Sequence, residues 1–337
     1  MPDADDAQPA NGPDVARLLE RVEAEILGGP RRYTPAEISE RAGVEREEAR
    51  RLWRALGFPT IDEADVVFTD GDVAALRAIG ELTTYGFADE ELRLAVARLF
   101  GQTFSRLASY QGQLLLDRAA ERPELLGSEE QLADLVAGVV PLLERLQGYA
   151  WRRQLAAYVA RMAAQGSDQL ASSPTTLAVG FVDMSGFTSL TKKATEAELR
   201  ALLDAFETSA TEIVGQHGGR IVKTLGDEVL FHAGDPAEAA EIALELLEAA
   251  AADQHLPDLR AGIAFGPVVS RLGDVYGSTV NIASRLTSIG RAGSVLVDRQ
   301  MRDALDGDAR FRLRARRPES VRGYHRLHSW RLRRADG

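Results

Sequence analysis

The 337-residue sequence contains no cysteine, so disulfide bonds and thiolate metal sites are excluded. Long apolar runs are also missing, because no stretch approaches the roughly 18 residues that a membrane-spanning helix needs. The first residues, MPDADDAQPANGPD, are acidic and polar, unlike a signal peptide, and predict a disordered tail over residues 1–12. Together these absences favour a cytoplasmic protein with no transmembrane segment.

An excess of positive charge is absent as well. The chain has 51 acidic against 40 basic side chains and a formal net charge of -11. This balance argues against binding nucleic acid through overall charge. Arginine is nevertheless concentrated between Arg310 and Arg334, a pattern that fits either a solvated strand face or a phosphate-facing surface.

The chain is long enough for two domains, and its residue pattern changes near the middle. Residues 13–165 carry apolar positions at helical spacing and predict an all-α domain. Thr34-Pro35-Ala36-Glu37 is a good helix start with a capping box. Residues 166–176 are polar and rich in serine, as expected of a linker. A second domain follows over residues 177–332.

The second domain alternates short apolar runs with helical patterns. Residues 177–183 predict a buried strand, and a helix follows at about 196–216. Residues 218–234 predict two strands around a tight Gly-Asp turn, and the next segments predict helix, strand, helix and strand: 236–251, 259–270, 278–290 and 294–298. The arginine-rich tail is expected to end in a hairpin. This order is the ferredoxin-like plan, so the fold class is α+β.

Two aspartates of this domain are candidate metal ligands. Asp183 ends the first strand beside a small-residue turn that enters a helix, where a carboxylate suits a metal bridged to phosphate. Asp227 lies at the turn of the predicted hairpin. In a ferredoxin-like sheet these two points lie side by side, so the two carboxylates could bridge two divalent cations. Taken singly, Asp183 also fits a helix cap and Asp227 a turn former. The neighbouring Glu228 is expected to point to the opposite face of its strand.

Three segments carry a resemblance to a known family. FVDMSGFTSLT, GGRIVKTLGDEVL and GDVYGSTVNIASRL resemble, in order and spacing, the characteristic stretches of class III nucleotidyl cyclases. The resemblance covers about residues 177–332. It implies an adenylate cyclase, a phosphorus–oxygen lyase that converts ATP to 3′,5′-cyclic AMP and pyrophosphate.

The resemblance also assigns roles to single residues. Asp183 and Asp227 match the two metal-binding aspartates, which implies two Mg²⁺ or Mn²⁺ ions per active site. Lys223 and Asp274 match the pair that reads the purine. A lysine can donate to the adenine ring nitrogen and a carboxylate can accept from the exocyclic amine, whereas guanine presents the reverse pattern. Without the resemblance, Lys223 would be an exposed strand lysine and Asp274 a turn residue.

The remaining matches concern the ribose and the phosphates. Asn281 and Arg285, four apart on one helix, match the transition-state pair, in which Asn281 orients the ribose and Arg285 stabilises charge at the α-phosphate. Phe187 and Thr188, in the turn after Asp183, are expected to contribute to substrate binding. Arg322 stands where a basic residue of the family contacts the terminal phosphates, although its segment diverges more than the others.

In this family the metal aspartates come from one subunit and the purine and transition-state residues from the other. This chain carries both halves in one catalytic domain. The resemblance therefore implies a head-to-tail homodimer with two equivalent composite sites.

The helical domain has a resemblance of its own. Residues 33–80 resemble a helix-turn-helix of the mercury-regulator type, but its second helix begins Val44-Glu45-Arg46-Glu47-Glu48, and three carboxylates there fit DNA poorly. A helical domain joined to a cyclase resembles soluble actinobacterial and mycobacterial cyclases, some of which are inhibited by this domain and respond to pH or lipids. We therefore expect a regulatory domain, with a lipid or other small effector as one option.

The histidines restrict a response to pH. All five, at positions 217, 232, 255, 325 and 328, lie in or after the first helix of the catalytic domain, so a histidine switch within the helical domain is excluded. One alternative from another class stays open: a catalytically silent nucleotide-binding sensor or transcription regulator with a helix-turn-helix head.

Overall fold

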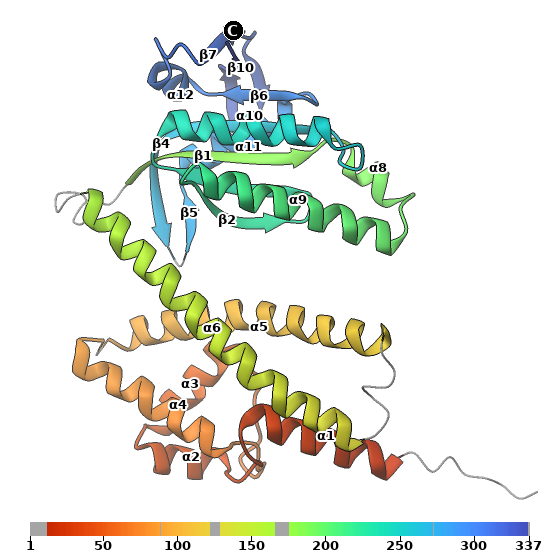
Figure 1. Cartoon of the computed structure of the whole chain (residues 1–337). Helices are drawn as coiled ribbons and strands as arrows, with labels where there is room; N and C mark the ends of the chain where they lie inside the picture. The colour runs from red at the N-terminus through yellow and green to blue at the C-terminus, as the bar shows by residue number, and fades with distance from the viewer. Residues whose placement is uncertain (1–11, 88, 122–128, 166–174, 272, 336–337) are drawn as a thin grey trace, which may run out of the picture. The chain divides into compact units, whose positions relative to one another are not determined.

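The computed structural model describes residues 12–87, 89–121, 129–165, 175–271 and 273–335 (Figure 1). It divides the chain into two compact units, Met1–Arg161 and Met162–Gly337. The predicted tail at 1–12 and linker at 166–176 lie almost wholly outside the described residues. No helix among the described residues has the length and apolar character to cross a membrane.

The first unit is helical, as predicted. Apart from a single bridge between Tyr33 and Phe68, its described residues form no strand pairing. The helices are α1 (Gly12–Leu27), α2 (Pro35–Ala42), α3 (Arg46–Ala55), α4 (Asp70–Glu81), the 3₁₀ turn η1 (Leu82–Tyr85), α5 (Glu90–Glu121) and α6 (Glu129–Gln165).

The helix-turn-helix-like segment has its own small core. The predicted capping box is present, because the Thr34 side chain accepts from Glu37 N–H and the Glu37 carboxylate accepts from Thr34 N–H. Ile38, Phe68 and Val73 form the buried centre between α2 and α4. Helix α3 is tied to α5 by an ion pair of 2.5 Å between Glu48 and Arg93.

The second unit is built on one mixed sheet whose strand order is β2-β3-β1-β4-β6-β10-β7. The first four strands and the helices between them follow the predicted ferredoxin-like order. The strands are β1 (Thr175–Met184), β2 (Arg220–Leu225), β3 (Glu228–Ala233), β4 (Leu259–Arg271), β5 (Asp274–Tyr276), β6 (Ser294–Val297), β7 (Phe311–Ala315), β8 (Glu319–Val321), β9 (Tyr324–Leu327) and β10 (Trp330–Arg334).

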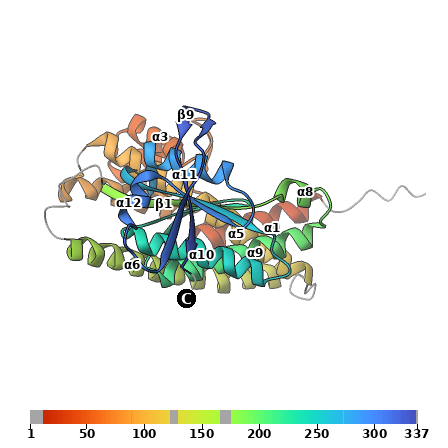
Figure 2. The same ribbon diagram turned by 90° about the horizontal axis from the view of Figure 1, so that it is seen from above.

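Helices cover both faces of this sheet. The main core lies between the sheet and α9 (Glu196–Gln216), α10 (Pro236–Ala252) and α12 (Arg299–Ala304), where Phe206, Ile242 and Met301 are almost fully buried. Helices α9 and α10 run side by side across this face (Figure 2). Helix α11 (Ser278–Ile289) packs on the opposite face against apolar side chains of β1, β3 and β4. We call the latter the α11 face.

The C-terminal segment is more elaborate than the predicted hairpin. Strands β7 and β10 pair with each other and extend the main sheet through β6. Between them, β8 and β9 form a separate two-stranded hairpin. The short elements β5, α12 and α8 (Phe187–Thr191) were not predicted from the pattern, because elements of three to six residues are too short to show a period.

Candidate active site

Asp183 lies at the end of the central strand β1, with its side chain only 13% exposed. Strand β1 is antiparallel to both neighbours, and Asp183 stands directly opposite Arg260 on β4 and Glu228 on β3. The Arg260 guanidinium donates from Nε to Asp183 Oδ2 at 2.7 Å, and its Nη2 lies 2.5 Å from the same oxygen. Arg260 on the neighbouring strand β4 therefore fixes the Asp183 carboxylate at the end of β1.

Asp227 occupies the two-residue turn between β2 and β3. Gly226 precedes it with φ 68°, a left-handed conformation that favours glycine. The backbone carbonyl of Asp227 accepts a hydrogen bond of 3.0 Å from Met184 N–H, which docks the turn onto the end of β1. The structure thus brings Asp183 and Asp227 together at one edge of the sheet.

Burial and the neighbouring Asp227 act against Arg260 in setting the pKa of Asp183. Burial is the largest cause that raises the pKa of Asp183, and the nearby Asp227 carboxylate raises it further. The Arg260 guanidinium lowers this pKa through its hydrogen bond and its charge, but the net direction is upward. Burial and the Asp227 carboxylate therefore outweigh the Arg260 guanidinium in setting the direction of this pKa shift.

The expectation that Glu228 faces away from Asp183 is wrong. It assumed that Asp227 and Glu228 are successive strand residues, whereas Asp227 belongs to the turn and Glu228 begins β3 opposite Leu225. Residues directly opposite each other on paired strands share a face, so Glu228 lies on the same face as Asp183. Burial, with the charges of Asp183 and Asp227, raises the pKa of Glu228 to about 7.

The donor set at this edge fits Mg²⁺ or Mn²⁺. Within the described residues no group of three or more histidine, aspartate or glutamate side chains has the arrangement of a complete metal site. Mg²⁺, however, commonly takes only one or two carboxylates from the protein and completes its shell with water and substrate phosphates. In addition, Ser185 Oγ, two residues after Asp183, is buried with no hydrogen-bond partner in the structure. Asp183 and Asp227 are therefore suited to hold such ions together with a nucleotide.

Lys223 and Asp274 form a second polar group on the α11 face. Lys223 Nζ donates to Asp274 Oδ2 at 2.5 Å, although 51 residues separate the two in the chain. Asp274 begins β5, and its Oδ1 accepts a hydrogen bond of 2.8 Å from Val275 N–H. Lys223 is the register partner of Leu230, whose side chain belongs to the core beneath α11. The pair is half-buried. Its hydrogen bonds fix the positions of both charged groups.

Asn281 and Arg285 lie on α11 with no such partners. Asn281 is exposed and Arg285 half-buried, and neither side chain makes a hydrogen bond or ion pair with any described residue. The helix itself is anchored at both ends: Thr279 Oγ1 donates to Pro267 C=O at 2.9 Å, and Thr287 Oγ1 donates to Phe181 C=O at 3.3 Å. A rigid helix thus presents two unengaged polar side chains.

The remaining predicted residues lie on short elements. Arg322 is exposed in the turn between β8 and β9, and this hairpin packs on α11 through Tyr324 and Leu327 against Leu286. The hairpin that carries Arg322 is therefore attached to the helix that carries Asn281 and Arg285. Phe187 packs its ring partly against the main core, whereas Thr188 is exposed one residue further into α8.

Sequence reasoning missed Arg260, the cation that pairs with Asp183. A weak signal was present, because Arg260 is a charged residue directly before the apolar run 261–269 of β4. Its partner was not predictable, since nothing in the pattern gives the register between β4 and β1.

Comparisons with known proteins agree with the resemblance. The model of the family "Adenylate and Guanylate cyclase catalytic domain" matches residues 171–334. A protein of Streptomyces coelicolor named adenylate cyclase is 42% identical, over 100% of this chain and 94% of that protein. An adenylate cyclase of Streptomyces griseus is 46% identical over 83% of this chain and 70% of its own length. The Mycobacterium tuberculosis protein named "pH-sensitive adenylate cyclase MT1302" is 33% identical over 84% of this chain and 72% of its own length.

Proposed function

Because the chain belongs to the adenylate and guanylate cyclase family, we propose that it is an adenylate cyclase that converts ATP to 3′,5′-cyclic AMP and pyrophosphate. The observation that carries this proposal is the meeting of Asp183 and Asp227 at the edge of a ferredoxin-like sheet. The Lys223–Asp274 pair on the same face supports the choice of purine.

In the proposed reaction the ribose 3′-oxygen attacks the α-phosphorus in line, the bond to the β-phosphate oxygen breaks, and pyrophosphate leaves. The 3′-hydroxyl proton leaves to solvent. Asp183 and Asp227 would hold two Mg²⁺ or Mn²⁺ ions, which would supply positive charge near the attacking oxygen and the triphosphate. Positioning and charge stabilisation, rather than a covalent enzyme intermediate, lower the barrier.

Each remaining residue acts on one part of the nucleotide. Asn281 orients the ribose, and Arg285 stabilises the charge that develops at the α-phosphate. Arg322 contacts the terminal phosphates from its hairpin. The start of α8, with Phe187 and Thr188, follows Asp183 closely in the chain and contributes to substrate binding. Phe187 would bind substrate through its backbone, because its ring packs partly against the core.

The purine pair favours ATP over GTP. Lys223 donates to the adenine ring nitrogen and Asp274 accepts from the exocyclic amine, whereas guanine offers a donor and an acceptor in the reverse places. In the absence of nucleotide, the ion pair of 2.5 Å between Lys223 and Asp274 neutralises both charges.

We further propose that the active site is shared by two chains in a head-to-tail homodimer. One chain would supply Asp183 and Asp227, and its partner Lys223, Asp274, Asn281 and Arg285. The unengaged side chains of Asn281 and Arg285 support this arrangement, because within the described residues they have no partner in their own chain. A two-fold axis then generates two equivalent sites.

The helical unit is proposed to regulate this activity in the cytoplasm by inhibition, in response to pH or to a lipid or other small effector. Its relative named as pH-sensitive supports the first signal. A DNA-binding role is less well supported. The outward arginines of α3 are neutralised: Arg46 pairs with Glu63, Arg50 with Glu47 and Glu63, and Arg54 with Glu47.

The test is to incubate the purified full chain with ATP and either Mn²⁺ or Mg²⁺ and to measure cyclic AMP. We expect product with the wild-type chain and none with Asp183→Ala. A chain that begins at Ser167 should be more active than the full chain if the helical unit inhibits. Absence of product from both lengths would refute the cyclase proposal and favour a silent nucleotide sensor.

A further inference from the structure

The arginine-rich strands β7 and β10 have one face that carries no residue of the proposed active site. In their antiparallel pairing Arg314 stands opposite Arg331, and Arg312 stands opposite Arg333. Arg316 extends this row just beyond β7, because its N–H bonds to the strand opposite. Opposite residues share a face, as do alternate residues along one strand. We call the resulting row the arginine face: Arg312, Arg314, Arg316, Arg331 and Arg333.

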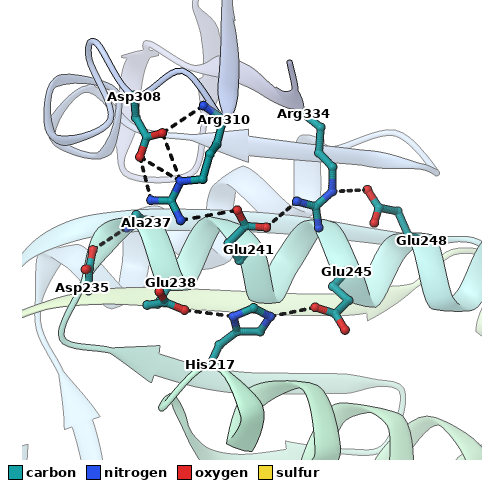
Figure 3. Close-up of polar contacts among 10 residues, drawn as sticks. All are labelled: His217, Asp235, Ala237, Glu238, Glu241, Glu245, Glu248, Asp308, Arg310 and Arg334. Carbon is teal, nitrogen blue, oxygen red and sulfur yellow. Dashed lines mark hydrogen bonds and ion pairs between the residues drawn. The ribbon is translucent and has the colours of Figure 1, made fainter. Parts of the chain in front are cut away.

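The other face of the same two strands is buried, and its charges are balanced. Phe311 and Leu332 belong to the main core. Arg310 and Arg334 lie on this side beside α10 and are paired with carboxylates (Figure 3), namely Asp308, Glu241 and Glu248. The concentration of arginine in the sequence therefore divides into a neutralised side and the arginine face.

Much of the positive charge on the arginine face is left without a carboxylate. The only acidic residue in the sequence 310–334 is Glu319, which pairs with Arg316 at 2.9 Å. Arg314 and Arg333 are exposed, and neither makes a hydrogen bond or ion pair with any residue that the structure describes. Two opposed strands thus present unpaired guanidinium groups to solvent.

Arg331 shows that these charges repel one another. Its Nη2 donates to Gly293 C=O at 3.3 Å, whereas its Nε is buried without a hydrogen-bond partner among the described residues. Burial is the largest cause that lowers the pKa of Arg331, and three neighbouring charges lower it further: Arg333, Arg316 and Arg291. Arg291 is exposed in the loop between α11 and β6 and adds a further cation beside the face. An anion bound there would reduce this repulsion.

The shape and composition of the arginine face indicate which kind of anion it fits. A two-stranded ribbon can enter the major groove of duplex DNA, but β7 and β10 belong to a sheet whose other face is packed on helices. The residues of these strands that project from the arginine face are all arginines, so they offer no aromatic ring on which unpaired bases could stack. A row of guanidinium groups without apolar side chains matches phosphate headgroups at the surface of an anionic bilayer.

We propose that the arginine face is a docking surface for anionic phospholipid headgroups, through which the chain associates with a membrane surface without inserting into it. The net charge of the whole chain is -11, so this association depends on local rather than overall charge. It should weaken as the salt concentration rises. The inference is independent of the proposed cyclase reaction, and either can fail without the other.

The test is co-sedimentation of the full-length chain with vesicles of equal parts phosphatidylcholine and phosphatidylglycerol, and with vesicles of phosphatidylcholine alone. We expect the wild-type chain to bind only the anionic vesicles and to be released at high salt. The double variant Arg314→Gln/Arg333→Gln should lower the partition coefficient about 30-fold, the loss expected for two arginines near an anionic surface. Absence of wild-type binding, or equal binding by this variant, would overturn the proposal.

Arg310→Gln/Arg334→Gln is the matched control. It changes the net charge by the same amount, but on the side where both arginines are already paired. At a temperature where thermal unfolding shows it to be folded, it should bind the anionic vesicles like wild type. An equal loss in both double variants would mean that net charge, not the arginine face, sets binding, and would refute the docking surface.

Two further measurements separate headgroup binding from other anion sites. Arg314→Lys/Arg333→Lys keeps both charges and should bind the anionic vesicles within about threefold of wild type. A loss as large as that of the glutamine variant would contradict electrostatic adsorption. Duplex DNA and single-stranded RNA, followed by fluorescence anisotropy at the same salt, should bind wild type no more tightly than Arg314→Gln/Arg333→Gln. Nucleic-acid binding that requires these two arginines, without binding to anionic vesicles, would replace the membrane as the partner.

Discussion

Asp274 has both carboxylate oxygens engaged, one by Lys223 and the other by the N–H of Val275. The backbone contact fixes the carboxylate relative to β5, and the lysine contact fixes Lys223 relative to the carboxylate. A base that meets this pair therefore meets a donor and an acceptor in a set arrangement. Purine selectivity should depend on the acceptor character of Asp274 rather than on its size.

Asp274→Asn tests this dependence, because it keeps the shape and replaces one acceptor oxygen with an amide donor. We expect kcat/KM for ATP to fall about 10- to 100-fold, because this is the loss expected when a hydrogen bond to a charged group is removed. The value of kcat/KM for GTP should fall much less. Steady-state kinetics with both nucleotides measure the ratio. Asp308→Asn is the control, since Asp308 likewise accepts from an adjacent backbone N–H and from a cation, Arg310. An equal loss for ATP and GTP would contradict the assigned role.

The three carboxylates at the end of β1, Asp183, Asp227 and Glu228, show what was predictable for single residues. Asp183 and Asp227 were identified because strand ends and hairpin tips have known neighbours in a ferredoxin-like sheet. Glu228 was misjudged, since the alternation of side chains along a strand applies only once the strand has begun. Arg260 was missed because a cross-strand contact depends on register, and register follows from turns and packing rather than from local pattern.

At the scale of elements, α9 and α10 are joined by a histidine clamp (Figure 3). His217, at the C-terminal end of α9, places Nδ1 2.9 Å from Glu238 and Nε2 2.7 Å from Glu245, two turns apart on α10. Only an imidazolium can donate to both carboxylates. The hydrogen bond to Glu245 is the largest cause that raises the pKa of His217.

This clamp predicts a pH-dependent contribution to stability. A pKa raised in the folded state means that the stabilisation is complete below the unfolded value of about 6.5 and is lost as pH rises through the folded value. We expect His217→Gln to lower the free energy of unfolding by about 1 kcal/mol at pH 5.5, allowing for partial exposure, and by less at pH 8.5. Thermal or urea unfolding at both pH values measures the difference. His255→Gln, at an exposed ring, should show no such trend; a His217→Gln effect that grows with pH would refute the clamp.

Helix α11 depends on a close approach to β4. A Cβ on Gly262 would lie 2.3 Å from Thr287 N and 2.5 Å from Ala283 C=O, both backbone atoms of α11. Neither can move without shifting the helix that carries Asn281 and Arg285. The glycine therefore sets the distance between this helix and the sheet.

We expect Gly262→Ala to cost about 1–3 kcal/mol of stability, the usual range for overpacking, and to reduce kcat at temperatures where the protein stays folded. Unfolding curves and cyclic AMP assays on the same preparation separate the two effects. Gly215→Ala is the matched control, because a Cβ at this position in α9 meets nothing within 4 Å. It should stabilise slightly, by about 0.5–1 kcal/mol, and leave kcat unchanged. Unaltered stability and kcat in Gly262→Ala would rule out the constraint.

Long elements were predicted more successfully than short ones. The 3.6-residue period marked α9 at its observed bounds, and apolar runs marked β1 and β4. Strand β5 was missed, although it carries Asp274 and pairs with the nearby end of β4, because three residues are too few to show a period. The β8–β9 hairpin was anticipated only as a generic hairpin, and its attachment to α11 depends on Leu286 and Leu327 meeting across 41 residues of sequence.

At the scale of the whole molecule, the residues of the proposed site differ in whether they have a partner within their own chain. Asp183 is held by Arg260, and Lys223 and Asp274 are paired with each other. Asn281 and Arg285 are the members without a partner among the described residues. A single chain thus holds every proposed residue, and in the proposed dimer Asn281 and Arg285 would act on a nucleotide bound by the partner chain.

Complementation between two inactive variants tests this arrangement. Asp183→Ala would lack a proposed metal ligand and Arg285→Ala the proposed transition-state cation, so each proposed homodimer would have two defective sites. In an equal mixture that re-equilibrates, half of the dimers are mixed, and each mixed dimer has one site with both functions intact. We therefore expect up to about a quarter of wild-type activity, in a cyclic AMP assay of the mixture. A mixture of Asp183→Ala with Asp227→Ala is the control and should stay inactive, because both lesions fall on the same half of the site. Activity no higher than that of the separate variants, with subunit exchange verified by differently tagged chains, would rule out the shared site.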